Sequence, residues 1–350
     1  MQNEMLITDL SYAQLESWLA TLGEPAFRAR QVFEWVYRSL VSDFGGMTNL
    51  PSSLRERLGT LAEVQSLELL ETIGSANGLS QKGLFRLHDQ ETIEAVLMYY
   101  EGRRTVCISS QVGCALSCPF CATGQSGFQR NLTSGEIISQ VLHYAAQLKS
   151  NGEMVSNVVF MGMGEPMANY EAVWQAIQVL NDARGLGLGG RRFVISTAGL
   201  VPGIQKLANE HVPVGLAVSL HAPTDDLRDR LVPANRHYPI VQLIEACREY
   251  TERTRRRVSF EYALMDGVND AREQAQALGE LLQGLLCHVN LIPLNPTAAC
   301  EYRPAPRASI MAFRKELNRL GVANTVRLAR GLDIQAGCGQ LRSRLGSVPG

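Results

Sequence analysis

No apolar stretch in this sequence approaches the roughly 18 residues that cross a bilayer. The first residues also lack the basic and apolar segments of a signal peptide. Eight cysteines among 350 residues are too sparse for a disulfide scaffold. These absences exclude a membrane protein and a secreted disulfide-rich domain. We therefore expect a soluble cytoplasmic protein with mostly reduced cysteines, and an apolar content of 45% predicts a folded core.

Lysine is scarce, with four residues against 29 arginines. The net charge of −1 hides an asymmetry, because residues 1–100 carry −6 and residues 101–350 carry +5. Arginine presents a planar fork for phosphates and a stacking surface for bases, so the bias suits a nucleic-acid partner. Ordinary solvated faces produce the same pattern. Charge alone therefore does not decide the partner.

The hydrophobic pattern changes character along the chain. Residues 10–62 show helical spacing, whereas residues 65–100 contain short strands separated by turns. Beyond them, six strands alternate with amphipathic helices, and the strands are expected at residues 106–109, 158–161, 193–196, 215–219, 259–264 and 289–293. We expect an N-terminal helical accessory domain with short strands over residues 1–100, and an α/β domain over residues 101–350. The alternation predicts a parallel barrel, a partial barrel or a doubly wound sheet, with function at the carboxyl ends of the strands.

Three cysteines, Cys114, Cys118 and Cys121, form a CxxxCxxC motif directly after the first strand of this second region. Zinc usually takes four ligands from paired CxxC or Cys/His motifs, and the sequence has no second CxxC and no HxxxH. Cys107 offers a fourth thiolate on the preceding strand. A [4Fe–4S] cluster accepts thiolates equally well, and three of them leave one iron open. We favour the cluster, with zinc and unliganded thiols as the alternatives.

This motif, placed after the first strand of a strand–helix repeat, resembles the radical S-adenosylmethionine (SAM) enzymes. In that superfamily the open iron binds SAM, and one electron cleaves it to methionine and a 5′-deoxyadenosyl radical. Further segments are similar to the RlmN family of adenine-C2 RNA methyltransferases, at residues 23–28, 160–166, 196–202, 219–223, 290–296 and 337–341. The resemblance implies a partial (βα)6 TIM-like barrel with a small N-terminal helical domain.

The resemblance also implies a chemistry, because C2 of adenine is electron-poor and does not attack the methyl group of SAM. Cys338 takes a methyl group from one SAM as a thiolate. The radical from a second SAM abstracts hydrogen from that methyl group, and the methylene radical adds to C2. Glu94 then removes the C2 proton. Cys107 attacks the sulfur of Cys338, which releases methylated RNA and leaves a disulfide that is reduced afterwards.

Several further expectations follow from the family. The cofactors are a [4Fe–4S] cluster, bound by Cys114, Cys118 and Cys121, and two SAM per turnover. The implied cofactor-binding residues lie at strand ends and are Gly164, Glu165, Ser196, Ser219, Leu220, His221 and Asn295. The implied substrates are 23S rRNA near the peptidyl-transferase centre and tRNA at the adenine 3′ to the anticodon. We also expect an electron donor such as flavodoxin or ferredoxin, no membrane association and a monomer.

Two other functions stay open at this point. A Cfr-type enzyme methylates C8 of the same rRNA adenine with equivalent cysteines. A zinc-held RNA-binding module without catalysis belongs to a different class. One departure from the family pattern concerns the predicted site, since Gly337 stands where alanine is usual before the methyl-carrying cysteine.

Overall fold

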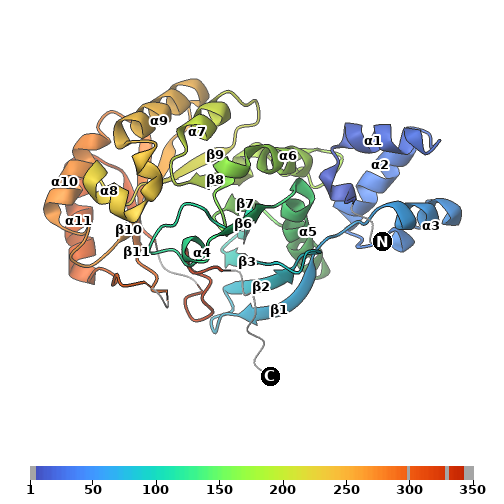
Figure 1. Cartoon of the computed structure of the whole chain (residues 1–350), viewed down its shortest axis with the longest axis horizontal. Coiled ribbons are helices and arrows are strands. Elements are labelled where there is room, and N and C mark those ends of the chain that lie inside the picture. The colour runs from blue at the N-terminus through green and yellow to red at the C-terminus, as the bar shows by residue number, and fades with distance from the viewer. Residues whose placement is uncertain (1–4, 298–299, 328–330, 343–350) are drawn as a thin grey trace.

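The structure is a computed structural model that describes residues 5–297, 300–327 and 331–342. A helical lobe projects from one side of a larger α/β body (Figure 1). The lobe contains α1 (Tyr12–Thr21), α2 (Phe27–Glu34) and α3 (Ser52–Leu61). Ser11 begins α1 in a capping box with Gln14, which satisfies amide groups that a helix start leaves free. The helices predicted for residues 10–62 are confirmed.

Within the described residues, ten strands form one sheet in the order β1-β2-β3-β4-β7-β8-β9-β10-β11-β12. Its first strands are β1 (Glu68–Gly74), β2 (Ser80–Arg86), β3 (Thr92–Tyr100) and β4 (Arg103–Cys107). The sheet continues with β7 (Asn157–Phe160), β8 (Phe193–Thr197), β9 (Gly215–Ser219), β10 (Val258–Leu264), β11 (Cys287–Pro293) and β12 (Asn324–Val326). Pairing is antiparallel from β1 to β4 and parallel from β4 onward. All six strands predicted for the second region are therefore present.

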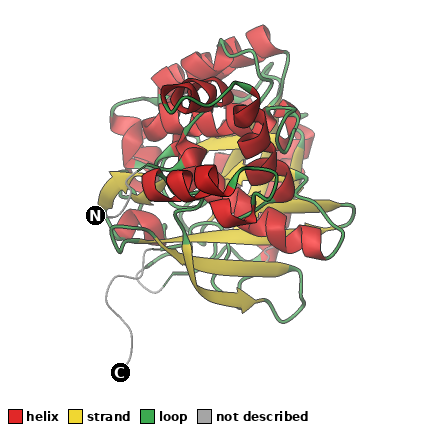
Figure 2. Cartoon of the chain, turned by 90° about the vertical axis from the view of Figure 1, so that its right-hand side faces the viewer, coloured by secondary structure: helices red, strands yellow, loops and turns green. Residues whose placement is uncertain are grey.

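Helices connect the parallel strands and pack over them, as Figure 2 shows from the side. They are α5 (Ser134–Ser150), α6 (Tyr170–Asn181), α7 (Val201–Ala208), α8 (Asp225–Leu231), α9 (Ile240–Thr254), α10 (Arg272–Leu281) and α11 (Arg307–Arg319). A short hairpin of β5 (Gln111–Gly113) and β6 (Phe128–Asn131) encloses α4 (Ala122–Gln125) between β4 and α5. Strands buried on both faces are typical of this architecture. The α/β class and the partial barrel are confirmed.

The sheet continues through residue 100, because β3 and β4 pair directly across a tight turn. The boundary expected near residue 100 thus falls inside a hairpin of the main sheet. The strands β1–β3 looked like part of the accessory domain because short antiparallel strands carry no signal of which sheet they join. We propose that the accessory unit ends near residue 64, where α3 has ended and β1 has not begun. In the part of the chain that the structure describes, no helix has the length and apolarity to span a bilayer.

Candidate active site

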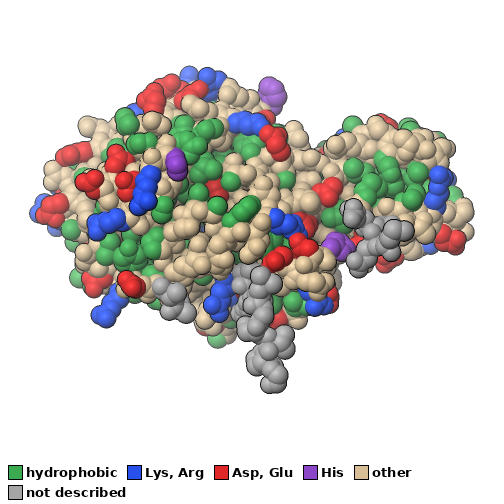
Figure 3. All heavy atoms as spheres, viewed as in Figure 1, with side chains coloured by type: hydrophobic (Ala, Val, Ile, Leu, Met, Phe, Trp, Pro, Cys, Tyr) green, Lys and Arg blue, Asp and Glu red, His purple; other side chains and the backbone are tan. Residues whose placement is uncertain are grey.

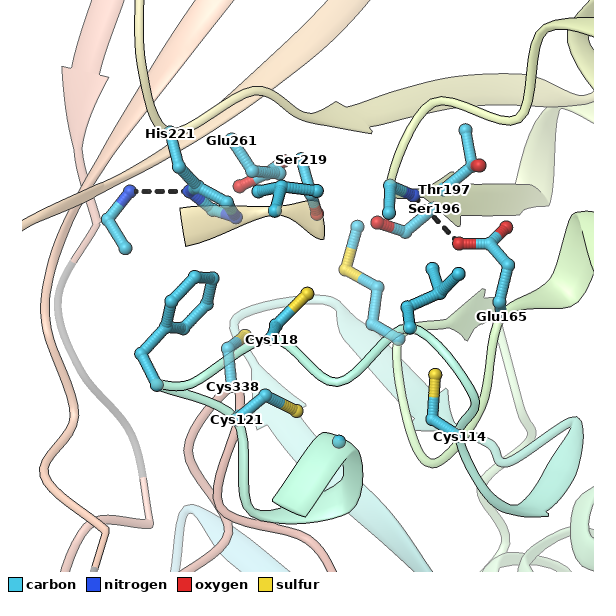
Figure 4. A pocket seen from close by; sticks show the side chains of 18 of the residues that line it. Cys114, Cys118, Cys121, Glu165, Ser196, Thr197, Ser219, His221, Glu261 and Cys338 are labelled. Carbon is cyan, nitrogen blue, oxygen red and sulfur yellow. Dashed lines mark hydrogen bonds between the residues drawn. The ribbon is translucent and has the colours of Figure 1, made fainter. Parts of the chain in front are cut away.

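A cavity lies at the carboxyl ends of the parallel strands, where open α/β sheets and barrels bind ligands. Its empty volume is about 1020 Å³, including space open to solvent. The loops after β5, β7, β8, β9 and β11 line it, together with the C-terminal segment around Cys338. Figure 4 shows Cys114, Cys118 and Cys121 on one side, facing Ser196, Ser219 and His221 on the other. The strand ends that the sequence predicted as functional therefore meet in one place.

The loop that carries the three cysteines is shaped by glycine. Gly113 has a φ of +73°, and a Cβ at this position would lie 1.9 Å from the carbonyl oxygen of Gly127. Only glycine tolerates both conditions. The Cys114 amide donates to that same Gly127 oxygen at 2.8 Å, and the Cys121 amide donates to Cys118 O at 3.1 Å. These local bonds turn the chain so that all three thiols line the cavity.

Two thiols of this loop, those of Cys114 and Cys118, favour the protonated form in the absence of a cation. Burial raises the pKa of Cys114 to about 12, and burial followed by the neighbouring Cys121 raises the pKa of Cys118 well above its ordinary value. A bound metal centre would compensate the charge of the thiolates. Among the described residues, no three His, Cys, Asp or Glu side chains are grouped so as to hold one metal ion. Each thiolate of a four-iron cluster binds its own iron, so three separated thiols on one loop, with open space before them, fit that cluster.

The side chain of Glu165 connects the loop after β7 to the end of β8. Its carboxylate accepts hydrogen bonds from the Met167 amide at 3.0 Å and from the Ala198 amide at 2.8 Å. It is 4% exposed, and burial raises its pKa although the Ala198 bond opposes the shift. Gly164 before it has a φ of +98° and packs against Gln111, where a Cβ would come within 2.5 Å. The Glu165 side chain therefore orders the cavity wall, and both Gly164 and Glu165 line the cavity.

His221 is a neutral donor on the opposite wall. Its Nδ1 accepts from the Ala263 amide at 3.0 Å, which leaves the proton on Nε2. Burial lowers its pKa to about 3, so the ring is uncharged at neutral pH. Its ring packs edge-on against Phe120 of the cysteine loop, with centroids 5.0 Å apart. Ser219 precedes it at the end of β9 and also lines the cavity.

Leu220 differs from the other predicted cofactor residues because its side chain is fully buried in the core and does not line the cavity. Its carbonyl oxygen accepts from Arg228 Nε at 3.1 Å, and the same guanidinium donates to Ala198 O and Ser219 O at 2.5 and 3.2 Å. Arg228 is itself completely buried. The arrangement ties the ends of β8 and β9 together beneath the cavity.

The C-terminal segment brings Cys338 to the cavity. Asn295 Nδ2 donates to Cys338 O at 3.1 Å, and the Ala122 amide donates to Gly339 O at 2.7 Å. Cys338 is exposed and lines the cavity with Cys118 and Cys121. The structure therefore brings the predicted methyl carrier and the predicted cluster ligands together.

Cys107 and Glu94 lie behind the cavity and do not line it. Burial, followed by the neighbouring Cys338, raises the pKa of Cys107 to about 12, while Arg327 opposes the shift. Glu94 on β3 is 1% exposed and forms an ion pair with Lys82. All eight cysteines lie in the described ranges and are free thiols, so the predicted disulfide is not formed in this structure.

Three polar cavity residues were missed in the sequence. Glu261 accepts from Asn290 Nδ2 at 2.8 Å and lies 3.4 Å from Arg327 Nη1, and Thr197 follows Ser196 at the end of β8. A carboxylate inside the apolar strand β10 was a usable signal for Glu261. Arg327 follows β12, a strand of three residues that is too short to be predicted from the hydrophobic pattern.

Comparisons with known proteins agree with this geometry. Residues 5–64 match the family described as Ribosomal RNA large subunit methyltransferase N-terminal domain, and residues 108–278 match the Radical SAM superfamily. The first match covers the helical lobe, and the second begins directly after β4 and includes the cysteine loop. The superfamily implies SAM and a [4Fe–4S] cluster.

Relatives match over nearly the whole chain. A protein of Moorella thermoacetica named "Probable dual-specificity RNA methyltransferase RlmN" is 50% identical over 334 residues, which cover 94% of each chain. A protein of Chloroflexus aurantiacus with the same name is 47% identical and covers 97% of this chain and 93% of its own. The crystal structure of a radical SAM methyltransferase from Sphaerobacter thermophilus matches with a TM-score of 0.95 and 50% identity, over 97% of this chain and 99% of that one. The chain therefore belongs to the RlmN family of radical SAM methyltransferases and is an enzyme that uses SAM.

Proposed function

We propose that this enzyme methylates C2 of adenine in RNA, with 23S rRNA and tRNA as substrates. The relatives are named as dual-specificity RNA methyltransferases, which supports RNA as the substrate class. One observation carries the proposal: Cys338 and the three cysteines of the loop line the same cavity, although they are distant in the sequence. A methyl-carrying thiol has to lie beside the place where SAM is bound.

The cofactors have assigned positions in this proposal. Cys114, Cys118 and Cys121 would hold a [4Fe–4S] cluster, which supplies the electron that converts SAM to a radical source. Gly164, Glu165, Ser196, Ser219, His221 and Asn295 would form the wall around SAM, with two SAM used per turnover. For Leu220 the backbone is the part that contributes, because its side chain is buried away from the cavity. A flavodoxin or ferredoxin is the proposed electron donor.

Cys338 and Cys107 have different surroundings that suit different tasks. Cys338 is exposed to the cavity, so its sulfur can accept a methyl group and then approach the adenine of the RNA. Cys107 is buried and has a raised pKa, which keeps its thiol protonated and unreactive until late in the reaction. Its thiol then attacks the sulfur of Cys338, so that an S–S bond forms and the bond from that sulfur to the methylene carbon breaks. The carbon takes a proton and becomes the methyl group on C2. A dithiol reductant afterwards restores both thiols.

Glu94 is the proposed base that takes the C2 proton. In this structure its carboxylate lies 3.0 Å from Lys82 Nζ and accepts from the Arg342 amide at 3.1 Å. Arg342 is close in sequence to Cys338, so Glu94 is adjacent to the segment that carries the methyl group. The proposed role requires that the adenine enters between this segment and β3.

One face of the molecule carries dispersed rather than clustered basic side chains. On the face shown in Figure 3, Lys and Arg side chains lie scattered among acidic ones and do not form one patch. Such a surface contributes phosphate contacts that position a substrate, while contacts to the base supply specificity.

Two cysteine variants and the product nucleoside test the proposal. Cys338→Ala should abolish methylation and keep the iron, whereas Cys107→Ala should accumulate protein covalently linked to RNA. Cys247→Ala is the matched control, since Cys247 is equally buried on α9 and lies outside the cavity. Mass spectrometry should identify 2-methyladenosine. Finding 8-methyladenosine would instead assign the Cfr-type reaction, and normal turnover by Cys107→Ala without a crosslink would contradict its role.

A further inference from the structure

A buried ion pair lies behind the cavity on the antiparallel part of the sheet. Lys82 Nζ and Glu94 Oε1 are 3.0 Å apart, and the two side chains are only 2% and 1% exposed. Residue 82 pairs with 96 and residue 84 with 94, so the two charges are diagonal neighbours on one face of the sheet. Removing two charges from water costs free energy that their attraction only partly offsets. The pair therefore contributes little to the free energy of folding.

Both partners also bond to the C-terminal segment. Lys82 Nζ donates to Gln335 O at 3.2 Å, and Glu94 Oε2 accepts from the Arg342 amide at 3.1 Å. Gln335 precedes Cys338 and Arg342 follows it. The ion pair therefore holds the segment by hydrogen bonds on both sides of Cys338, the proposed methyl carrier.

The segment needs such anchors because it has little structure of its own. Residues 331–342 contain turns and bends but no helix or strand. The bonds from Asn295 to Cys338 and from Ala122 to Gly339 hold it against the barrel side of the cavity. Lys82 and Glu94 hold it from the opposite side, on β2 and β3. The position of the segment between these two sets of bonds determines where the sulfur of Cys338 lies.

We propose that Lys82 is a positioning residue that, with Glu94, clamps residues 335–342 so that Cys338 faces the cofactor cavity. An ammonium group suits this task, because its three donors serve the carboxylate and the Gln335 carbonyl at once. Lys82 lies outside the cavity lining and acts through the segment. The inference rests on the proposed function only in naming Cys338 as the methyl carrier.

Hydrogen exchange of the cluster-loaded protein without RNA tests the clamp directly. In Lys82→Met, exchange in residues 331–342 should rise at least about tenfold, because the segment loses an anchor. In methylation assays kcat should fall about 100-fold while KM for RNA changes less than about 2-fold. Lys82→Arg keeps the charge and should recover kcat to within about tenfold of the native enzyme. Arg86→Met is the matched control, since Arg86 lies on the same strand as Lys82 and the hydrogen bonds of its side chain, among the described residues, go to Glu68 on β1.

A second variant guards against loss of folding. Lys82→Met removes the ammonium partner of the buried Glu94, whereas Lys82→Met with Glu94→Leu removes both charges and both bonds. The double variant should stay folded in thermal unfolding and still show the faster exchange. Unchanged exchange in either folded variant, or a KM increase without loss of kcat, overturns the clamp. Faster exchange in Lys82→Met, found while the native enzyme itself methylates no RNA, would support the clamp and contradict the proposed function, so the two failures are distinguishable.

Discussion

Two segments meet at the cavity, and they are held in opposite ways. The cysteine loop, residues 113–127, is shaped by its own glycine, its own turn bonds and a short hairpin. The segment of residues 331–342 is held by hydrogen bonds to residues that are distant in the sequence, among them Ala76, Lys82, Ala122, Thr123 and Asn295. A locally determined loop keeps its shape when remote parts of the chain change. A segment held from outside loses its position when one anchor is removed, so the following changes should separate the two.

The largest effect is expected from the cysteine loop itself. Cys118→Ala removes one of three thiolates, so cluster iron and methylation should both fall below detection. Cys287→Ala is the control, because Cys287 is similarly half-buried but lies outside the cavity. Iron analysis of the two purified variants checks this result. Full iron in Cys118→Ala would show that this thiol is not a ligand.

The shape of the loop should be nearly as sensitive. Gly113→Ala forces a Cβ against Gly127 O, and we expect a loss of about 3 kcal/mol in the free energy of unfolding together with most of the iron. Gly152→Ala is matched to it, with the same φ of +73° but no atom within 4 Å. Gly152→Ala should lower the free energy of unfolding by about 1 kcal/mol and leave the iron content unchanged. Equal effects in the two variants would show that backbone strain alone, rather than the close approach, shapes the loop.

A smaller effect is expected from one anchor of the C-terminal segment. Asn295→Ala removes the bond to Cys338 O while the Lys82, Glu94 and Ala122 anchors remain, so kcat should fall about tenfold with iron unchanged. Asn181→Ala is the control, since Asn181 makes the same kind of bond to Leu188 O at 2.7 Å in a remote loop. Steady-state kinetics measure both. Loss of iron in Asn295→Ala would mean that the two segments are not independent.

The smallest effect concerns His221, which supports the cysteine loop through Phe120. Its pKa is about 3 in the folded protein, below the ordinary value, because burial disfavours the charged ring. Between that pKa and about 6.5 only the unfolded chain binds the proton, so the free energy of unfolding should decrease as pH falls, by about 1 kcal/mol per unit. Denaturant unfolding at pH 7 and pH 5 measures the slope. His221→Gln should flatten it, and an unaltered slope would contradict the assignment.

The same contrast explains what the sequence could predict. The CxxxCxxC spacing and the strand–helix alternation are local patterns, so the position of the cysteine loop in the chain and the barrel were predicted correctly. The strand ends carrying Glu165, Ser196 and Ser219 followed from the alternation, because parallel strands bring their carboxyl ends together.

The pairing of strands and side chains that are distant in the sequence could not be predicted from local patterns. The continuation of the sheet through β3 and β4 was missed, because nothing in two short strands indicates their partners. Glu261 and Arg327 became neighbours only through the parallel pairing of β10, β11 and β12. Lys82 gave no signal at all, since its partners Glu94 and Gln335 lie on another strand and in the C-terminal segment. Positions fixed by tertiary contacts require the structure.

We propose that Cys114, Cys118 and Cys121 hold a [4Fe–4S] cluster beside SAM, and the metal content of the protein tests this most directly. Iron and acid-labile sulfide should be measured in protein purified without oxygen. We expect a brown protein with about four iron and four sulfide per chain. A colourless protein with one zinc and no iron would contradict it, because the methyl group of Cys338 would then have no radical to activate it.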